Sequence, residues 1–412
     1  MNNKGTMEQK NKLIPELRFP EFVNDGEWKI NEVGNLFEIT RGYVLPMNMV
    51  KDYKSNENPY PVYSSQTKNN GLAGFYTNFL YENAITWTTD GANAGDVNYR
   101  EGKFYCTNVC GVLINKDGFA NKCIAEIINS VTKNYVSYVG NPKLMNGVMS
   151  KIKIPVPQIK EQQKIADCLS SLDDLITAHN DKLETLKNHK KGLLQNLFPD
   201  PSTSSGQKVP NYRFPEFVND GEWEEDALGK ICDVRDGTHD SPKYVLKGYA
   251  LITSKNLLTT GEIDSENVNY ITENDYQQIN KRSKVNIDDI LFGMIGTIGN
   301  PVIVKKDGFA IKNVALIKSI GMIDQKFLLQ QLKSNYILKQ FEKENAGGIL
   351  KFIALGTIRN LNIVIPSISE QKKIEKCLST IENLITAQTE KVEQLKIHKK
   401  GLMQGLFPKI EE

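Results

Sequence analysis

The chain has 412 residues, of which 40% are hydrophobic and 24% charged, and its 51 Lys and Arg residues against 49 Asp and Glu residues give a net charge of +2. These proportions are typical of a globular protein and exclude a disordered or fibrous chain. The charge balance identifies no partner, so a nucleic-acid binder of this composition would have to concentrate its basic groups locally. No stretch approaches 18 consecutive apolar residues and the polar start lacks an apolar signal core, so we expect a cytoplasmic protein without membrane contact.

The sequence contains one framework twice. The segment RFPEFVNDGEW occurs at residues 18–28 and again at 213–223. A second segment, residues 161–199, recurs at 370–408 with 24 identities in 39 positions. The parts between them share little beyond a polar Gly turn and a Phe-x-x-x-Asn-Val run. Two units of about 200 residues are too long and too few for a solenoid, so the pattern predicts an internal duplication in which divergent domains alternate with conserved helices.

We therefore predict an α+β fold with two globular domains, separated by an antiparallel coiled coil of two long helices and related by a pseudo-twofold axis. The predicted parts, in chain order, are domain 1 with its N-terminal tail (1–157), helix 1 (158–199), a Pro/Ser/Gly-rich linker (200–212), domain 2 (213–366), helix 2 (367–408) and a short tail (409–412).

Both predicted helices carry an apolar residue at alternating steps of four and three, with two polar positions in each copy. Such an a/d pattern, sustained over more than four heptads, indicates a coiled coil. The predicted core residues are Ile165, Leu169, Leu172, Ile176, Leu183, Leu186 and Leu193 in the first helix, and Ile374, Leu378, Ile381, Ile385, Val392, Leu395 and Leu402 in the second. The polar positions are His179 and Lys190, matched by Gln388 and Lys399.

Pairing the two matching seams with each other is the simplest way to bury them. In an antiparallel pair the two divergent domains would lie at opposite ends of the coil. Two alternatives stay open: each helix packs only on its own domain, or the seam joins two chains. The basic runs at 187–191 and 396–400 complement the negative end of the helix dipole, and contact with DNA or a partner subunit is a second possibility for them.

A search for catalytic motifs finds no phosphate-binding loop, no HExxH and no GxSxG. The sequence Asn58-Pro59-Tyr60-Pro61 only partly matches an adenine-methyltransferase motif, and we predict a turn there. The acidic pairs Asp173-Asp174 and Asp288-Asp289 are predicted to be solvated surface. None of the six cysteines forms a CxxC pair, so we expect buried thiols and no metal site. These features are typical of a binding protein and not of an enzyme.

The two RFPEF...GEW segments, the two EQ-x-KI...LITA...HKKGL-x-Q-x-LFP helices and the divergent domains between them resemble the DNA-specificity subunit of type I restriction–modification systems. The likeness covers nearly the whole chain. It implies two target-recognition domains, each reading one half of a bipartite double-stranded DNA site, and a coiled coil between them. It also implies assembly with two methylation subunits and with restriction subunits, which would supply the S-adenosylmethionine, ATP and Mg²⁺ sites; no cofactor or metal is expected in this chain.

Within the two domains, we chose DNA-contact candidates from polar loops that carry side chains suited to bases and phosphates. The candidates of domain 1 are Arg41, Tyr43, Ser65, Gln66, Thr67, Lys68, Asn69, Asn70, Thr89, Lys143 and Asn146. Those of domain 2 are Arg235, Thr238, His239, Ser241, Lys243, Ser254, Lys255, Asn256, Thr297 and Lys351. Each could instead belong to an ordinary polar turn. Two rival functions also stay open, a coiled-coil scaffold whose domains bind proteins and an enzyme with an unrecognised motif.

Overall fold

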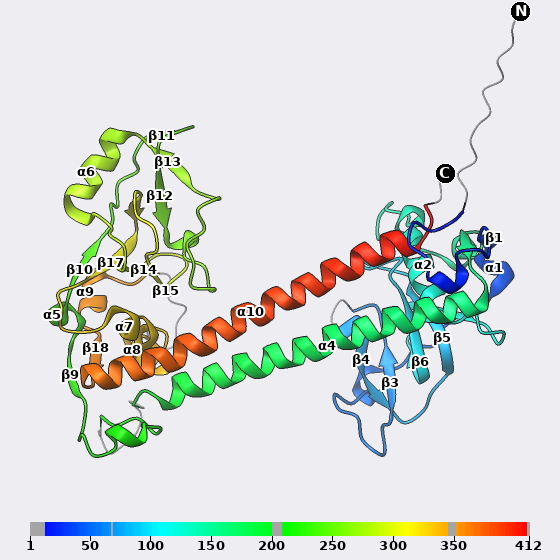
Figure 1. The fold of residues 1–412 in the computed structure, drawn as a ribbon, viewed down its shortest axis with the longest axis horizontal. Helices are drawn as coiled ribbons and strands as arrows, with labels where there is room; N and C mark the ends of the chain where they lie inside the picture. The colour runs from blue at the N-terminus through cyan, green and yellow to red at the C-terminus, as the bar shows by residue number, and fades with distance from the viewer. Residues whose placement is uncertain (1–12, 67–68, 200–207, 345–351, 410–412) are drawn as a thin grey trace, which may run out of the picture. The chain divides into compact units, whose positions relative to one another are not determined.

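The computed structural model describes residues 13–66, 69–199, 208–344 and 352–409. The chain forms two compact units, unit 1 with Met1–Asn180 and Glu390–Glu412, and unit 2 with Asp181–Thr389. Each unit holds one globular domain and part of both long helices, α4 (Ile159–Asn196) and α10 (Ile368–Leu406), which are labelled in Figure 1. The predicted linker at 200–212 lies mostly outside the described residues.

The domain of unit 1 is built on a six-stranded sheet of order β2-β7-β5-β6-β3-β4, antiparallel except for the β3–β6 pair. Helix α2 and the start of α4 cover one face, where Trp87, Leu113, Ile124 and Leu169 share a buried cluster. Its elements are β1 (Lys29–Glu32), α1 (Val33–Leu36), β2 (Glu38–Arg41), β3 (Tyr60–Tyr63), β4 (Leu72–Tyr76), β5 (Tyr81–Thr88), β6 (Val97–Cys106), β7 (Cys110–Ile114), α2 (Lys122–Thr132), α3 (Asn146–Met149) and β8 (Lys153–Val156), with 3-10 helices η1 (Pro20–Phe22), η2 (Met47–Met49), η3 (Asn69–Gly71) and η4 (Lys133–Tyr135).

The turn predicted at residues 58–61 is wrong in its second half, because Tyr60 and Pro61 belong to strand β3. A proline has no N–H for a sheet ladder. Strand β3 tolerates Pro61 because its pairing with β6 begins only at Val62.

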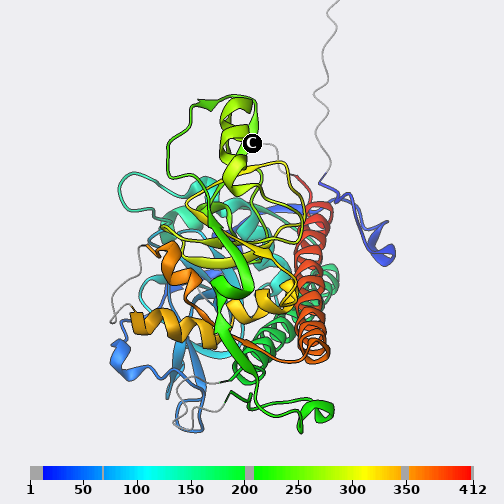
Figure 2. The same cartoon turned by 90° about the vertical axis from the view of Figure 1, so that its left-hand side faces the viewer.

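The domain of unit 2 splits its strands between two four-stranded sheets, β10-β17-β14-β15 and β11-β13-β12-β16. Helix α6 lies beside the second sheet, as the ribbons of Figure 1 and Figure 2 show. Tyr276 of α6 stacks there on Tyr249 of β12, at 4.0 Å between ring centroids. The elements are β9 (Glu224–Ala227), α5 (Leu228–Ile231), β10 (Cys232–Asp236), β11 (Tyr244–Val245), β12 (Tyr249–Thr253), β13 (Asn269–Ile271), α6 (Glu273–Ser283), β14 (Ile290–Gly293), β15 (Gly299–Ile303), β16 (Ala310–Lys312), β17 (Val314–Ser319), α7 (Gln325–Leu332), α8 (Asn335–Glu344), α9 (Leu355–Arg359) and β18 (Asn362–Ile365), with 3-10 helices η5 (Pro215–Phe217) and η6 (Ser254–Asn256).

Each domain is opened and closed by a two-stranded antiparallel sheet, β1 with β8 in unit 1 and β9 with β18 in unit 2. The first strand of each pair, β1 or β9, follows the repeated RFPEF...GEW segment. The second, β8 or β18, precedes the long helix. The conserved framework therefore brackets each divergent domain at both of its chain ends.

In each unit the repeated segments meet at a buried carboxylate that binds an arginine and a tryptophan. We call this group of three residues the clasp. In unit 1, Arg18 donates two hydrogen bonds to Glu161, of 2.7 and 2.8 Å, and the indole N–H of Trp28 donates to the same carboxylate at 3.2 Å. Unit 2 repeats this arrangement with Arg213, Trp223 and Glu370 at 2.8, 2.8 and 3.2 Å. The Glu161 and Glu370 side chains are each 1% exposed.

The two long helices run antiparallel within each unit. In unit 1, Lys399 of α10 pairs with Asp173 of α4 at 2.6 Å, while Leu406, further along α10, packs in one cluster with the earlier α4 residue Ile165. Unit 2 shows the same arrangement. There Lys190 pairs with Glu382 at 2.7 Å, and the end of α4 packs with the start of α10. All fourteen predicted core residues of the seam are buried or half-buried.

The prediction of a solvated Asp173 is wrong, because its carboxylate holds an ion pair with Lys399 and another, at 2.9 Å, with Lys122 of α2. Burial raises the pKa of Asp173, but hydrogen bonds from Lys399 and Lys122 outweigh it and hold this pKa below its usual value. In unit 2, Glu382 takes the equivalent place and also accepts hydrogen bonds from Gln330 of α7 at 3.0 Å and from Lys333, just after α7, at 3.3 Å. We call these two groups the charge layers; each joins α4, α10 and one helix of the domain.

Candidate nucleic-acid interface

In unit 1, the turn after β6 brings three of the predicted loops together. The backbone N–H of Tyr43 donates to Cys106 at 3.2 Å, the Thr107 hydroxyl donates to Ser64 at 3.0 Å, and the N–H of Thr89 donates to Val109 at 3.0 Å. This turn contains the Phe-x-x-x-Asn-Val run that both units share. The repeat of this run is visible in the sequence, but its position between the candidate loops is visible only in the structure.

A fourth loop joins through Asp90. Asp90 forms an antiparallel β-bridge with Lys143, and the Lys143 Nζ and Asp90 Oδ1 atoms lie 3.9 Å apart. The Asn93 amide donates to Ser65 at 3.4 Å, which links this loop to the 65–70 segment. The structure thus gathers all four predicted loops of domain 1 around one end of the sheet.

The candidates of unit 1 differ in exposure. Asn69 and Asn70 have φ angles of 51° and 50°, in the left-handed region that Asn tolerates better than most residues. Thr89 is buried, and its hydroxyl contacts Asp90 and the Val109 carbonyl, so we assign it to loop support. The exposed candidates are Arg41, Tyr43, Gln66, Asn69, Asn70 and Lys143, and the half-buried ones are Ser65 and Asn146. Thr67 and Lys68 lie outside the described residues.

In unit 2, Asn313 holds the equivalent position. Its amide oxygen lies 2.9 Å from Nδ1 of His239, and its carbonyl accepts from the Ser254 hydroxyl at 2.9 Å. The same Ser254 oxygen accepts from the N–H of Met294 at 3.1 Å. Three predicted loops, containing Thr238–Ser241, Ser254–Asn256 and Thr297, therefore converge here.

Ser254 and Asn256 are 2% and 5% exposed, and their polar groups are used inside the fold. The Asn256 side chain accepts from the Thr253 N–H and donates to the Asn267 carbonyl at 2.9 Å. We assign both residues to loop support because their side chains are satisfied away from solvent. Lys255 between them is exposed, as are His239, Ser241, Lys243 and Thr297, whereas Thr238 is half-buried. Lys351 lies outside the described residues.

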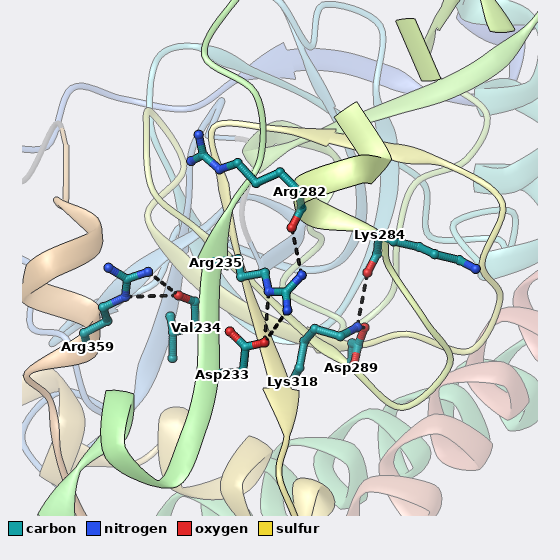
Figure 3. Close-up of polar contacts among 8 residues, drawn as sticks. All are labelled: Asp233, Val234, Arg235, Arg282, Lys284, Asp289, Lys318 and Arg359. Atoms are coloured by element: carbon teal, nitrogen blue, oxygen red, sulfur yellow. Dashed lines mark hydrogen bonds and ion pairs between the residues drawn. The ribbon is translucent and has the colours of Figure 1, made fainter. Parts of the chain in front are cut away.

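Arg235 is committed to neighbours within unit 2, as Figure 3 shows. Its guanidinium donates to Asp233 at 2.6 and 2.9 Å and to the Arg282 carbonyl at 2.9 Å. The hydrogen bond from Arg235 lowers the pKa of Asp233, so this carboxylate keeps its charge. Arg235 therefore connects β10 to the last turn of α6, and its charge is already balanced by Asp233.

Figure 3 also shows three basic residues, Lys284, Lys318 and Arg359, that lie outside the predicted loops. Arg359 donates to the Val234 carbonyl at 2.7 and 3.0 Å, and the exposed Lys284 has its carbonyl held by Lys318 at 3.1 Å. Lys318 also pairs with Asp289, which is 6% exposed, so the prediction of a solvated Asp289 is wrong. The missed residues lie outside the Gly-rich loops that guided the search, and no motif marked them.

Two copies of one framework, each gathering several polar loops at one end of a sheet, define a duplicated recognition protein. Residues 25–188 and 220–396 match the family described as the type I restriction modification DNA specificity domain. The chain belongs to this family, and its role is DNA recognition in a restriction–modification system. No helix among the residues that the structure describes is long and apolar enough to cross a membrane.

One curated relative matches nearly the whole chain, and another matches about a third of it. The type I restriction enzyme MjaVIII specificity subunit of Methanocaldococcus jannaschii is 27% identical over 97% of this chain and 95% of its own length. A putative specificity subunit N-terminus from Mycoplasma pneumoniae, S.MpnORF289P, is 38% identical over 35% of this chain and 76% of its length. The crystal structure of the S subunit from M. genitalium shares the fold, with a TM-score of 0.64 at 17% identity over 96% of this chain and all of that one.

Proposed function

We propose that this chain directs the methylation and restriction subunits of a type I complex to a bipartite DNA site, with each unit reading one half. The observation that carries this proposal is the internal repeat. Both units share the clasp, the two-stranded sheet at the domain ends and the turn with the Phe-x-x-x-Asn-Val run. Their predicted recognition loops have different sequences. Two readers on one framework suit a site with two different halves, because linking them makes the second contact intramolecular.

The repeated helices support a complex with two methylation subunits. Leu175 in unit 1 and Leu384 in unit 2 occupy equivalent positions of α4 and α10 and are 43% and 52% exposed. An exposed alanine follows one turn later in each helix, Ala178 or Ala387. Two copies of the same apolar surface suit two copies of one partner, so we assign one methylation subunit to each.

DNA methylation and cleavage are carried out by the partner subunits. The chain supplies recognition, the methylation subunits bind S-adenosylmethionine, and the restriction subunits use ATP and Mg²⁺. The complex would act in the cytoplasm, where bacterial and archaeal DNA is found. The rival scaffold function gains no support from the relatives.

Methylome sequencing of host DNA, with and without the gene, tests the proposal. The gene should add adenine methylation at one motif made of two short specified halves separated by unspecified bases. A host whose methylated motifs are identical in both states would contradict the proposal. A purified chain that methylates or cuts DNA without partners would contradict the assignment of chemistry to the other subunits.

A further inference from the structure

Arg100 of strand β6 is a buried cation without a carboxylate partner. Its residue is 8% exposed, and no ion pair among the described residues includes it. The guanidinium contacts only uncharged groups: it donates to the Thr86 hydroxyl at 3.0 Å and to the Asn70 carbonyl at 2.7 Å, and it lies 3.7 Å from the centre of the Tyr63 ring. The buried Arg18 and Arg213, in contrast, each hold a glutamate with two hydrogen bonds.

This arrangement leaves a charge to be balanced. Burial disfavours the charged form of Arg100 and lowers its pKa, but an arginine stays protonated at neutral pH. A buried charge without a counter-charge is unfavourable, because neutral acceptors and an aromatic face replace only part of its hydration. Groups of this kind occur preferentially at binding sites.

Arg100 lines a polar cleft of about 310 Å³ in unit 1. Ser64, Asn70, Thr88, Asn93 and Asn98 contribute hydroxyl and amide groups to its walls. The one carboxylate of the cleft, Asp96, is already paired with Lys133 at 2.5 Å. The cleft therefore combines an unbalanced positive charge with neutral hydrogen-bond donors, a combination that suits an anion.

The cleft lies between two of the predicted DNA loops. Ser64 precedes the 65–70 segment and Asn70 is its last residue, while Thr88 and Asn93 flank the Asp90 loop. The Asn93–Ser65 hydrogen bond links the two loops. A duplex that contacts both loops would bring its backbone to the mouth of the cleft.

We propose that this cleft binds one phosphodiester group of the DNA backbone, with Arg100 as its counter-charge. The inference rests on the proposed function and adds a residue to it. A phosphate fits better than a base edge, because base edges carry no net charge and would leave the guanidinium without a counter-charge. Arg100 thus positions the duplex on unit 1 without reading its sequence.

The test uses the full chain assembled with its methylation subunits and a duplex that carries the motif found by methylome sequencing. Arg100→Gln removes the charge but keeps an amide donor, Arg100→Lys keeps the charge, and Thr86→Val removes one neutral contact of Arg100. The Gln variant should bind about ten-fold more weakly, with a salt-dependence slope smaller by about 0.9, the value for one phosphate. The Lys and Val variants should keep the wild-type slope.

Ethylation interference gives a second readout. Ethylating one backbone phosphate beside one half-site should weaken binding by the wild type but not by Arg100→Gln, since the variant no longer uses that charge. An unchanged slope and an unchanged interference pattern in Arg100→Gln would overturn the subsite while leaving the proposed function intact. If the wild type has no methylated motif at all, the proposed function fails first.

Discussion

At the scale of single residues, the clasp explains why the two repeated segments stay alike. The Glu161 carboxylate, 1% exposed, is the ion-pair partner of Arg18 at 2.7 Å. The hydrogen bond to Glu161 raises the pKa of Arg18, against the effect of burial, and Glu370 does the same for Arg213. Arg, Trp and Glu are thus fixed together, although 143 residues separate Arg18 from Glu161.

Removing the carboxylate charge of the clasp should destabilise one unit. Glu161→Gln leaves Arg18 buried without a counter-charge, which costs about 3 kcal/mol for a broken buried ion pair. Hydrogen exchange should show the loss in peptides of unit 1, and Glu370→Gln should show it in unit 2. Glu21→Gln is the control, because the Lys164–Glu21 pair is about half exposed and a surface pair of this kind contributes little to stability. Equal protection in Glu161→Gln and the control would refute the role of the clasp.

The sequence identified the residues of the clasp but not their contact. Repetition marked RFPEF...GEW and the EQ pair as framework, whereas nothing local links an arginine to a glutamate so far along the chain. The recognition residues were harder to predict. Loop chemistry led to exposed candidates such as Lys143 and Lys255, but it also selected Ser254, Asn256 and Thr89, whose side chains turned out to support their loops. Arg100 was missed because it lies inside a strand.

At the scale of elements, the helices were the most predictable part, because a sustained heptad pattern specifies which face is buried. The contacts made at the polar positions of these helices were harder to predict. The helix dipole, or contact with DNA or a partner, is the sequence-based explanation of the basic runs, and the heptad pattern places Lys190 and Lys399 at polar positions of the seam. In the structure these two lysines pair with carboxylates of the opposite helix. Such pairs depend on which residues face each other across two helices, and that information is absent from either helix alone.

The charge layers should give stability a specific pH dependence. The pKa of Asp173 lies below its usual value of 3.8 and that of Glu382 below its usual 4.5, since lysines outweigh the effect of burial on each. A carboxylate whose pKa is lower in the folded than in the unfolded state stabilises the fold at any pH above its unfolded-state pKa. This stabilisation is lost as the pH falls through the folded-state pKa. Asp173→Asn and Glu382→Gln should each cost about 1–2 kcal/mol at pH 7, and the difference from wild type should shrink below about pH 4.

Thermal unfolding between pH 3 and pH 7 measures this difference. Asp174→Asn is the matched control, because Asp174 is the exposed neighbour of Asp173 and has no ion pair among the described residues. A difference between wild type and Asp173→Asn that stays constant across the pH range would show that its ionisation is not coupled to folding.

At the scale of the whole molecule, the duplication repeats the surface to which we assign a methylation subunit. Leu175→Glu should remove the methylation subunit assigned to unit 1, and Leu384→Glu the one assigned to unit 2, because a buried unpaired carboxylate opposes binding. Native mass spectrometry of the assembled complex should show one methylation subunit with either variant and none with both. The control is Ser171→Glu, an exposed position of the same helix. Two bound subunits in the double variant would place the interface elsewhere.

The divergent domains should be exchangeable without rebuilding the framework. Residues 29–157 begin just after the Trp28 clasp and end where β8 pairs with β1, so a domain from a relative can be joined at two points that the shared two-stranded sheet already holds together. Unit 2 has its own sheets, core clusters and clasp, so its loops should keep their conformation. The exchanged chain should therefore methylate a motif in which one half is new and the other half and its bases are unchanged. Methylome sequencing of the hybrid reads both halves at once. A hybrid that folds and methylates DNA but changes both halves, or neither, would contradict the assignment of one half-site to each unit.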